Sequence, residues 1–244
     1  MTRVKLIHLS DIHVGRQYFS DELGEKVIRQ VNQMKPSCVV ISGDLTDDGY
    51  YHEYLDAKNY IDRIETENKL IVPGNHDSRN AGDALFDELF GTRYPVCARK
   101  GIKMVGIDSS EPDIDDGHIG RVSYPFIREN LSGEDFKILV LHHHLIPIPD
   151  TGRERNIPVD AGDVLKLIAE LGVNLVLCGH KHVPWLWVLN GIVFLYAGTA
   201  TTLRIKAHIE QSYNYIELDP GRELKIYRVS SATGQKKLVY KIQL

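Results

Sequence analysis

The sequence has few of the features that mark disulfide-bonded, membrane-spanning or secreted proteins. Its 244 residues include only three cysteines, which stand far apart at Cys38, Cys97 and Cys178. The number is odd, and Cys38 and Cys178 lie in apolar runs, so we expect no disulfide framework and a reducing compartment. No apolar run approaches the roughly 18 residues that span a bilayer, and the N-terminus lacks a signal-peptide profile. We therefore expect a cytoplasmic protein without membrane contact.

Charge of neither sign is in large excess, and the chain lacks a Pro/Gly-rich linker, an internal repeat or a low-complexity tract. It carries 29 basic and 33 acidic residues, for a formal net charge of −4. This balance excludes the overall basic field that drives non-specific binding to duplex DNA, although it allows a local basic patch. With 43% hydrophobic and 25% charged residues, the composition is that of a globular protein. We expect residues 1–244 to form a single domain.

Short apolar runs of strand length alternate with segments of helical period over most of the chain. The runs predict strands at residues 4–9, 38–41, 69–72, 103–107, 137–141, 174–177 and 192–196. The helical patterns cover residues 21–34, 51–65, 84–89 and 159–171. Strands that alternate with helices predict an α/β architecture. From about residue 203 the helical pattern stops, and a β-rich C-terminal part is predicted to extend a second sheet with strands at 213–218, 224–229 and 238–242.

Ligand-type side chains follow five of the predicted strands, at the point where each strand ends. They are Asp11 and His13, then Asp44, the run Asn75-His76-Asp77, the run His142-His143-His144, and His180 with His182. Because sites in open α/β sheets assemble at the carboxyl ends of strands, we expect these groups to converge. Carboxylate, amide and imidazole groups without a thiolate point to manganese, iron or zinc. The set is large enough for two ions, and Asp44 is the natural bridge between them.

Each of these groups has a simpler interpretation on its own. Asp and Asn residues accept left-handed backbone angles, so Asp11, Asp44 and Asn75 could be turn residues only. The pair at 180 and 182 could be solvated, and His143 could be a buried core residue. Coincidence at five successive strand ends is much harder to accept than any one of these alternatives, so the whole set favours a metal site.

The ordered series of motifs resembles the calcineurin-like metallophosphoesterase family over roughly residues 4 to 200. The motifs that carry the resemblance are Asp11-x-His13, Gly43-Asp44, Gly74-Asn75-His76-Asp77, His142 and Gly179-His180-x-His182. Five motifs in the same order make the match specific. The resemblance implies a four-layer α/β/β/α sandwich with two central mixed β-sheets, which agrees with the α/β pattern.

Carried over motif by motif, the resemblance implies two divalent transition-metal ions, with manganese favoured over iron or zinc. One ion would be held by Asp11, His13, Asp44 and His182, and the other by Asp44, Asn75, His142 and His180. His76 would face the substrate, where an imidazole of near-neutral pKa stabilises phosphoryl oxygens or protonates the leaving alkoxide. Asp44 and His76 are thus the predicted catalytic residues, and Asn75 and His76 are also predicted to contact substrate.

The three consecutive histidines leave a choice for the fifth motif. Family members use the leading histidine of a pair or triplet, which implies His142 as the ligand. Leu145 follows the triplet here, a departure from the commoner His-His-Pro. His144 shares side-chain parity with His142 in an extended strand, so it is the alternative.

Within the family, the compact length and the histidine triplet most resemble the class III cyclic nucleotide phosphodiesterases. The expected function is hydrolysis of a cyclic nucleotide or other small phosphodiester by a hydroxide that bridges the two ions. A nuclease or a phosphomonoesterase on the same fold is the alternative, although the charge balance does not favour nucleic acid. A non-catalytic, metal-binding scaffold for a protein partner is the alternative from another class. The sequence leaves open whether the protein forms a homodimer.

Three further features have both a functional and a structural interpretation. The polar loop 149–156 follows the His142 strand, and Arg153 and Arg155 could bind the non-reacting part of the substrate or pair with Glu154 or Asp160 in solvent. Cys178 is more consistent with a small buried residue than with a metal ligand. Trp185 and Trp187 share one face of an extended strand, which favours packing over stacking on a base.

Overall fold

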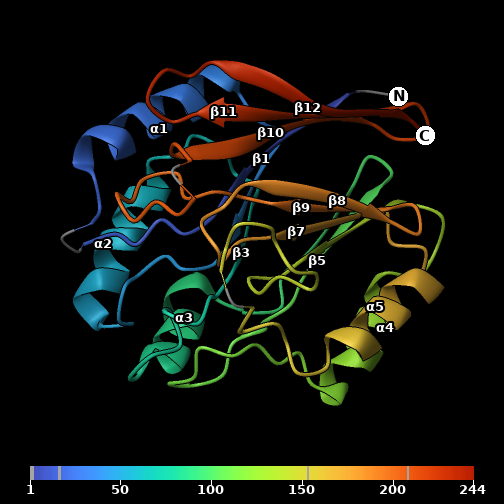
Figure 1. Ribbon diagram of the computed structural model, residues 1–244, viewed down its shortest axis with the longest axis horizontal. Helices are drawn as coiled ribbons and strands as arrows, with labels where there is room; N and C mark the ends of the chain where they lie inside the picture. The colour runs from blue at the N-terminus through green and yellow to red at the C-terminus, as the bar shows by residue number, and fades with distance from the viewer. Residues whose placement is uncertain (1–2, 16–17, 153, 208) are drawn as a thin grey trace.

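Two mixed β-sheets pack face to face in the computed structural model, which describes residues 3–15, 18–152, 154–207 and 209–244 (Figure 1). The first sheet has the strand order β12 (Lys236–Gln243), β11 (Glu223–Ser230), β10 (Ser212–Asp219), β1 (Val4–Leu9), β2 (Cys38–Ser42) and β3 (Lys69–Val72). The second has the order β4 (Val96–Arg99), β5 (Ile102–Gly106), β6 (Phe136–Val140), β7 (Leu175–Cys178), β9 (Ile192–Tyr196) and β8 (Trp185–Leu189). In each sheet the ligand-bearing strands run parallel to one another.

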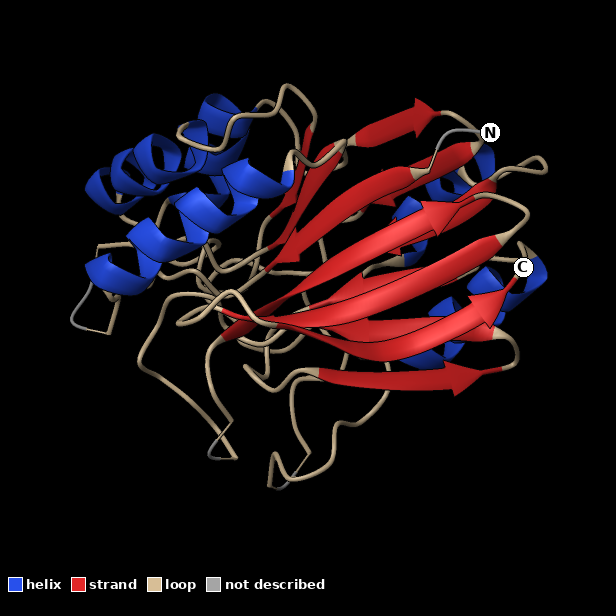
Figure 2. Cartoon of the chain, turned by 90° about the horizontal axis from the view of Figure 1, so that it is seen from above, coloured by secondary structure: helices blue, strands red, loops and turns tan. Residues whose placement is uncertain are grey.

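Helices pack against the outer side of each sheet, which gives the molecule four layers, and they leave the C-terminal strands of the first sheet partly uncovered (Figure 2). The first sheet is covered by α1 (Asp21–Met34), α2 (Tyr51–Asp62) and α3 (Gly82–Phe90). The second is covered by α4 (Tyr124–Asn130), which continues a 3-10 turn at Arg121–Ser123, and by α5 (Ala161–Glu170). The predicted α/β/β/α sandwich with two central mixed sheets is therefore confirmed.

Burial on both faces explains why the central strands read as continuous apolar runs. In β1, Leu6 packs into the core between the two sheets, whereas Ile7 and Leu9 pack under the helices of the first sheet. The inter-sheet core also takes Met104 and Ile138 from the second sheet. Three apolar layers thus fix the two sheets relative to each other, and the loops at the carboxyl ends of the parallel strands are held on a rigid frame.

The predicted strands and helices are present with small changes at their ends, and one prediction is wrong. The C-terminal strands do not extend a second sheet: β10 pairs antiparallel with β1, with Val4 opposite Leu218, so they complete the sheet that begins the chain. The helix predicted over 51–65 ends at Asp62. The pattern missed β4, β8 and α4, because β4 and β8 are edge strands without a continuous buried run and α4 is only seven residues long.

None of the described helices is long and apolar enough to cross a membrane. That residues 1–244 form a single domain stays a prediction.

Candidate metal centre

The loops that follow β1, β2, β3, β6 and β7 meet at one edge of the sandwich, and backbone hydrogen bonds join them. The amides of Asp11 and His13 donate to the carbonyls of Gly43 and Asp44, each at 3.0 Å. The amide of Gly179 donates to the carbonyl of His142 at 2.9 Å. These bonds continue the strand pairing beyond the strand ends within each sheet, and the contacts of His142 with the carbonyl of Ser42 and of the His180 amide with the Asp11 carboxylate join the loops of the two sheets.

Several residues in these loops have left-handed backbone angles, which are uncommon outside glycine. They have φ between 50° and 74° and are Asp11, His13, Asp44, His180 and His182. Asp and His adopt this region more readily than β-branched residues do. Strained backbone of this kind persists only where surrounding structure over-determines it, and it is concentrated at functional sites.

Two glycines let the loops approach one another more closely than any side chain would permit. A Cβ at Gly74 would collide with the Asp44 carboxylate, and a Cβ at Gly179 would collide with the Ser10 hydroxyl. Both positions therefore require glycine for packing reasons, and the Gly in the Gly-Asn-His-Asp and Gly-His-x-His motifs has a physical explanation.

The first group of ligand-type atoms comes from Asp11, His13, Asp44 and His182, all buried and all within 4.8 Å of one another. The Nε2 atoms of His13 and His182 lie 3.3 Å apart. Thr46 O and Asp47 Oδ1 are 3.1 and 2.9 Å from Nδ1 of His13. These oxygens place the ring proton of His13 on Nδ1, so its Nε2 lone pair is directed at the other ligand atoms.

The same reasoning applies to His182, whose Nδ1 donates to the carbonyl of Arg204 at 2.8 Å. Two nitrogen lone pairs 3.3 Å apart repel each other unless a proton or a metal ion lies between them. Asp11 Oδ1, at 3.3 Å from His182 Nε2, adds a third electron-rich atom. The first group therefore fits a divalent transition metal.

A second group forms around Asp44, Asn75, His142 and His180. His142 donates from Nδ1 to the carbonyl of Ser42 at 2.7 Å, which directs its Nε2 toward Asn75 Oδ1 at 3.2 Å and His180 Nδ1 at 3.3 Å. Asp44 Oδ2 lies 3.3 Å from His142 Nε2 and 3.6 Å from His13 Nε2, so one carboxylate oxygen faces both groups. All seven side chains predicted as ligands thus come together in two groups that share Asp44.

Carboxylates favour positive charge on one imidazole in each group, His13 and His142, whereas burial lowers the pKa of His182 to about 4 and holds that of His180 well below its usual value. Burial alone would lower the pKa of His13 and of His142, but the nearby acids raise the first and bring the pKa of His142 to about 9. Conversely, although burial opposes it, His142 and His76 hold the pKa of Asp44 well below its usual range. A site that stabilises cations at these atoms suits a metal ion.

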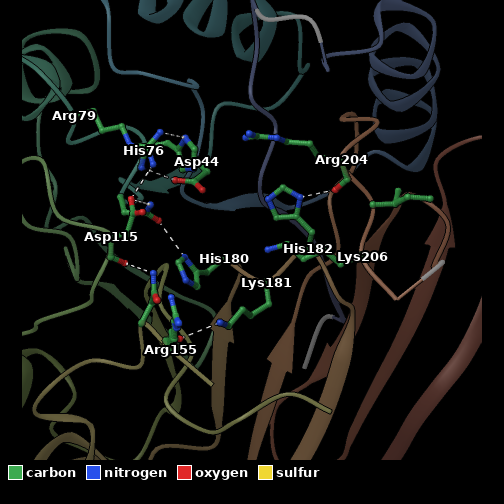
Figure 3. Close-up of a pocket in the computed structure, with 13 residues that line it drawn as sticks. Asp44, His76, Arg79, Asp115, Arg155, His180, Lys181, His182, Arg204 and Lys206 are labelled. Atoms are coloured by element: carbon green, nitrogen blue, oxygen red, sulfur yellow. Dashed lines mark hydrogen bonds and ion pairs between the residues drawn. The ribbon is translucent and has the colours of Figure 1, made fainter. Parts of the chain in front are cut away.

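His76 lies on the pocket wall beside Asp44, as predicted for a residue that faces substrate (Figure 3). Its backbone amide donates to Asp44 Oδ1 at 3.0 Å, and its ring packs edge-on against His13 with centroids 4.8 Å apart. Burial lowers the pKa of His76. Asp77, the last residue of this motif, has a structural role, because its carboxylate accepts the backbone amides of Leu45, Thr46 and Gly74.

The three histidines of the triplet have different contacts, and the structure places His142, not His144, in the second group of ligand-type atoms. The ring of His144 turns to Glu154, with Nε2 and Oε1 2.8 Å apart. His143 is buried and contacts the Ser109 hydroxyl and the carbonyl of Asp115. The leading histidine therefore directs a ring nitrogen at the other ligand-type atoms, whereas the rings of His143 and His144 pack against the ring of His180, with centroids 4.7 and 5.5 Å apart.

The two groups lie at the base of a pocket of about 510 Å³ whose walls are rich in positive charge. The cations on its walls are Arg79, Arg155, Lys181, Arg204 and Lys206. Sequence reasoning missed most of them, together with Asp47 and Asp115. Asp47 and Arg79 could have been found, since each stands three residues after a motif residue, but Asp115, Arg204 and Lys206 lie in loops without a recognisable pattern.

Asp115 joins several parts of the pocket. Its Oδ1 accepts from Arg79 at 2.8 Å and from the Asn75 amide nitrogen at 3.1 Å. Hydrogen bonding to Arg79 lowers the pKa of Asp115. Because the nitrogen of the Asn75 amide is held by Asp115, its oxygen must face His142 and His180.

The structure also shows where Arg155 of the loop 149–156 and the two acids considered as its partners lie. Arg155 lines the pocket, whereas Arg153 lies outside the described residues. Both acids proposed as solvent partners are engaged elsewhere: Glu154 with His144 and Lys181, and Asp160 with two backbone amides and a tyrosine hydroxyl.

Cys178 is fully buried among apolar side chains, and burial raises the pKa of its thiol. Trp185 and Trp187 pack against each other with ring centroids 5.7 Å apart, and the Trp187 indole donates to the carbonyl of Pro147. Neither tryptophan lines the pocket. For Cys178 and for the two tryptophans, the structure therefore favours a role in packing over metal binding or stacking on a base.

Comparisons with known proteins agree with this geometry. A probable cyclic nucleotide phosphodiesterase of Rhodococcus erythropolis is 27% identical over 233 residues, which cover 87% of this chain and 71% of that protein. A cAMP/cGMP dual specificity phosphodiesterase of Mycobacterium tuberculosis is 29% identical over 198 residues, which cover 72% of this chain and 61% of that protein.

Solved structures share the fold at low sequence identity. A purple acid phosphatase of yellow lupin has a TM-score of 0.77 at 15% identity, over 99% of this chain and 54% of that chain. A dimetal phosphatase of Danio rerio has a TM-score of 0.69 at 11% identity, over 98% of both chains.

Residues 4–184 match the calcineurin-like phosphoesterase family. With the metal-ligand cluster, this match and the curated relatives support a metal-dependent phosphoester hydrolase. The matched region spans most of the chain and includes every strand end that bears a ligand-type side chain, so this chain belongs to the calcineurin-like phosphoesterase family.

Proposed function

We propose that this protein hydrolyses a small phosphodiester, with a cyclic nucleotide as the first candidate, using two divalent metal ions of which manganese is favoured. The first ion would be held by Asp11, His13, Asp44 and His182, and the second by Asp44, Asn75, His142 and His180. The observation that carries the proposal is the pair of converging lone-pair groups that share one oxygen of Asp44 at the base of a cationic pocket. Relatives named as cyclic nucleotide phosphodiesterases support the diester.

Two such ions supply an activated water nucleophile at neutral pH and Lewis-acid stabilisation of the phosphoryl group. The residues of this chain do the rest. Asp44 stays ionised because the histidines around it lower its pKa, so it can serve both groups at once. His76, fixed to Asp44 by its backbone amide, offers an imidazole at the pocket wall that can protonate the departing alkoxide or donate to a phosphoryl oxygen.

Arg155 and the other cations on the wall would bind the non-reacting part of the substrate and increase the local concentration of anionic substrate. The net charge of the whole chain is negative, so this positive lining is a property of the pocket and not of the surface as a whole.

The direct test compares bis-p-nitrophenyl phosphate with p-nitrophenyl phosphate, using protein stripped of metal and then reconstituted with Mn²⁺. We expect metal-dependent turnover with a higher kcat/KM for the diester. A large preference for the monoester would overturn the choice of a diester, and a protein that binds metal but turns over neither compound would be a scaffold instead. Cyclic nucleotides and linear dinucleotides in the same assay then narrow the substrate.

A further inference from the structure

Two of the five cations on the pocket wall have no carboxylate partner among the residues that the structure describes. Arg79 pairs with Asp115 at 2.8 Å and Arg204 with Asp47 at 3.6 Å. Lys181 pairs with a glutamate at 3.3 Å. Arg155 and Lys206 form no ion pair with any described residue, although both line the pocket. The Asp11 and Asp44 carboxylates attract the Lys206 ammonium without forming an ion pair with it. Positive charge in a cleft without a directly paired carboxylate attracts anions.

Each of these two cations belongs to a segment that is fixed to a ligand loop. The Lys181 ammonium donates to the carbonyl of Arg155 at 2.9 Å, and Lys181 lies between the ligand-type residues 180 and 182. On the other segment, the carbonyl of Arg204, two residues before Lys206, accepts from His182 at 2.8 Å. The backbone that carries each cation is therefore held at a set position relative to the metal-binding atoms.

Arg155 and Lys206 approach the pocket from different loops, with Lys181 between them in the view of Figure 3. A phosphodiester carries one negative charge, which the metal groups at the base of the pocket would neutralise. The charge of the two wall cations then stays available for another group. Arginine presents a fork of donors that matches a phosphate, and lysine binds phosphate as a point charge.

We propose that the preferred substrate carries a second phosphate, on its non-reacting part, and that Arg155 and Lys206 bind this group. The inference rests on the proposed diesterase function and names a substrate class for it: a phosphodiester with an additional terminal phosphate. The cavity of about 510 Å³ extends beyond the ligand groups to both cations, so one molecule can occupy the base and the wall together.

The test uses two dinucleotides that differ only in this group: adenylyl-(3′,5′)-adenosine with a free 5′ hydroxyl, and the same compound with a 5′ phosphate. Charge-assisted hydrogen bonds to the additional phosphate should make kcat/KM roughly 10 to 100 times higher for the phosphorylated compound. Arg155→Met and Lys206→Met should each reduce this ratio, and the double variant should bring it close to one. Lys166→Met, on the exposed face of α5, is the matched control and should leave the ratio unchanged.

A ratio near one for the unaltered protein would overturn the inference, and so would a ratio that survives in the double variant. Equal losses on both dinucleotides would also overturn it, because the two cations would then bind the scissile group. If neither dinucleotide is cleaved, the proposed function fails for linear diesters. Equilibrium binding of both compounds to metal-loaded His76→Ala protein then decides the inference separately, since equal affinities would contradict it.

Discussion

The two ligand groups share Asp44 but differ in charge and in access to solvent. The first adds the Asp11 carboxylate to two histidines, and a further acid, Asp47, contacts the ring of His13. The second adds no carboxylate of its own, because its remaining ligands are an amide and two histidines. Apart from the shared Asp44, one residue of the first group, His182, lines the open pocket, whereas two residues of the second, Asn75 and His180, do so. We therefore expect the first group to bind its ion more tightly and the second to face the substrate.

The residues that hydrogen-bond to the ligand side chains also differ between the two groups, and this difference again favours tighter binding by the first. A carboxylate behind a ligating imidazole increases its basicity, and Asp47 occupies that place behind His13. Behind His142, Nδ1 faces the carbonyl of Ser42, and no carboxylate of the described residues takes the place that Asp47 has behind His13. The second group depends instead on Asp115, which holds the Asn75 amide in place from an exposed loop. This difference suggests that the two ions can be separated experimentally.

The largest expected effect comes from Asp44→Ala, which breaks both groups together. Loss of the shared oxygen should lower kcat by at least about 10³-fold, because the two ions can no longer be held as a pair. Metal content measured on the purified variant should fall below that of the parent protein.

The fold should survive this substitution, since the three apolar cores contain no contribution from Asp44. Circular dichroism and thermal unfolding are the controls. A variant that is folded, fully loaded with metal and fully active would show that Asp44 does not connect the two groups.

His76→Ala should have the next largest effect and leave both groups intact. Removal of a general acid costs about 10²–10⁴ in rate, and His76 is not among the seven ligands. The measurement is kcat on bis-p-nitrophenyl phosphate beside metal content on the same sample. Parallel loss of metal and rate would mean that His76 belongs to a ligand group after all.

Asp115→Ala should weaken metal binding at the second group and leave metal binding at the first group unchanged. Without its acceptor the Asn75 amide can rotate, and loss of such an outer partner typically costs about 10–100-fold in metal affinity. We expect titration with Mn²⁺ to show one site of unchanged affinity and one weakened site.

Asp116→Ala is the matched control, because Asp116 is the exposed neighbour of Asp115 and does not line the pocket. Equal weakening of both sites in Asp115→Ala, or the same change in Asp116→Ala, would contradict a specific role in the second group.

The smallest effect on activity is expected at His8, a buried histidine of β1. Its pKa shows the effect of burial without the nearby acids that raise the pKa of His13 and of His142. Its two ring nitrogens hydrogen-bond Ser42 and Asn214, and burial lowers its pKa to about 3, in contrast to about 9 for His142. A folded-state pKa below the unfolded value of about 6.5 means that stability is fully present above pH 6.5 and is lost as the pH falls toward 3. Between pH 7 and pH 5, His8 should account for about 2 kcal/mol of lost unfolding free energy.

His8→Gln should remove this contribution. Urea unfolding at the two pH values, compared between the variant and the parent, cancels the contributions of all other histidines. A pH dependence that is the same in both proteins would mean that His8 is not held neutral by its surroundings.

The central fold and the ligand positions were predictable because both depend on local patterns. Runs such as 38–41 are apolar at every position only when both faces are buried, and the ligand residues stand directly at the ends of those runs. The left-handed turns after the strands favour glycine, aspartate and histidine, which gave the motifs a recognisable form.

What the sequence left open depends on contacts between distant segments. The placement of β10 beside β1 requires pairing over more than 200 residues, which no local pattern records. Asp115 and Lys206 reach the pocket only because long loops fold back over it, and their neighbours in sequence have no common period. The choice between His142 and His144 likewise depended on Glu154, which lies on another loop and draws His144 away.

The left-handed residues at the strand ends also bear on how the protein responds to heat. Each costs about 1–2 kcal/mol relative to ordinary backbone, so the edge that carries the ligand-type residues stores strain that opposes folding. An ion that binds only the folded chain stabilises it by about 2.7 kcal/mol at a hundred times its dissociation constant. The melting temperature of this protein should therefore rise with the concentration of free metal. The same five residues that place the ligand-type side chains would make its thermal stability depend on how much metal is available.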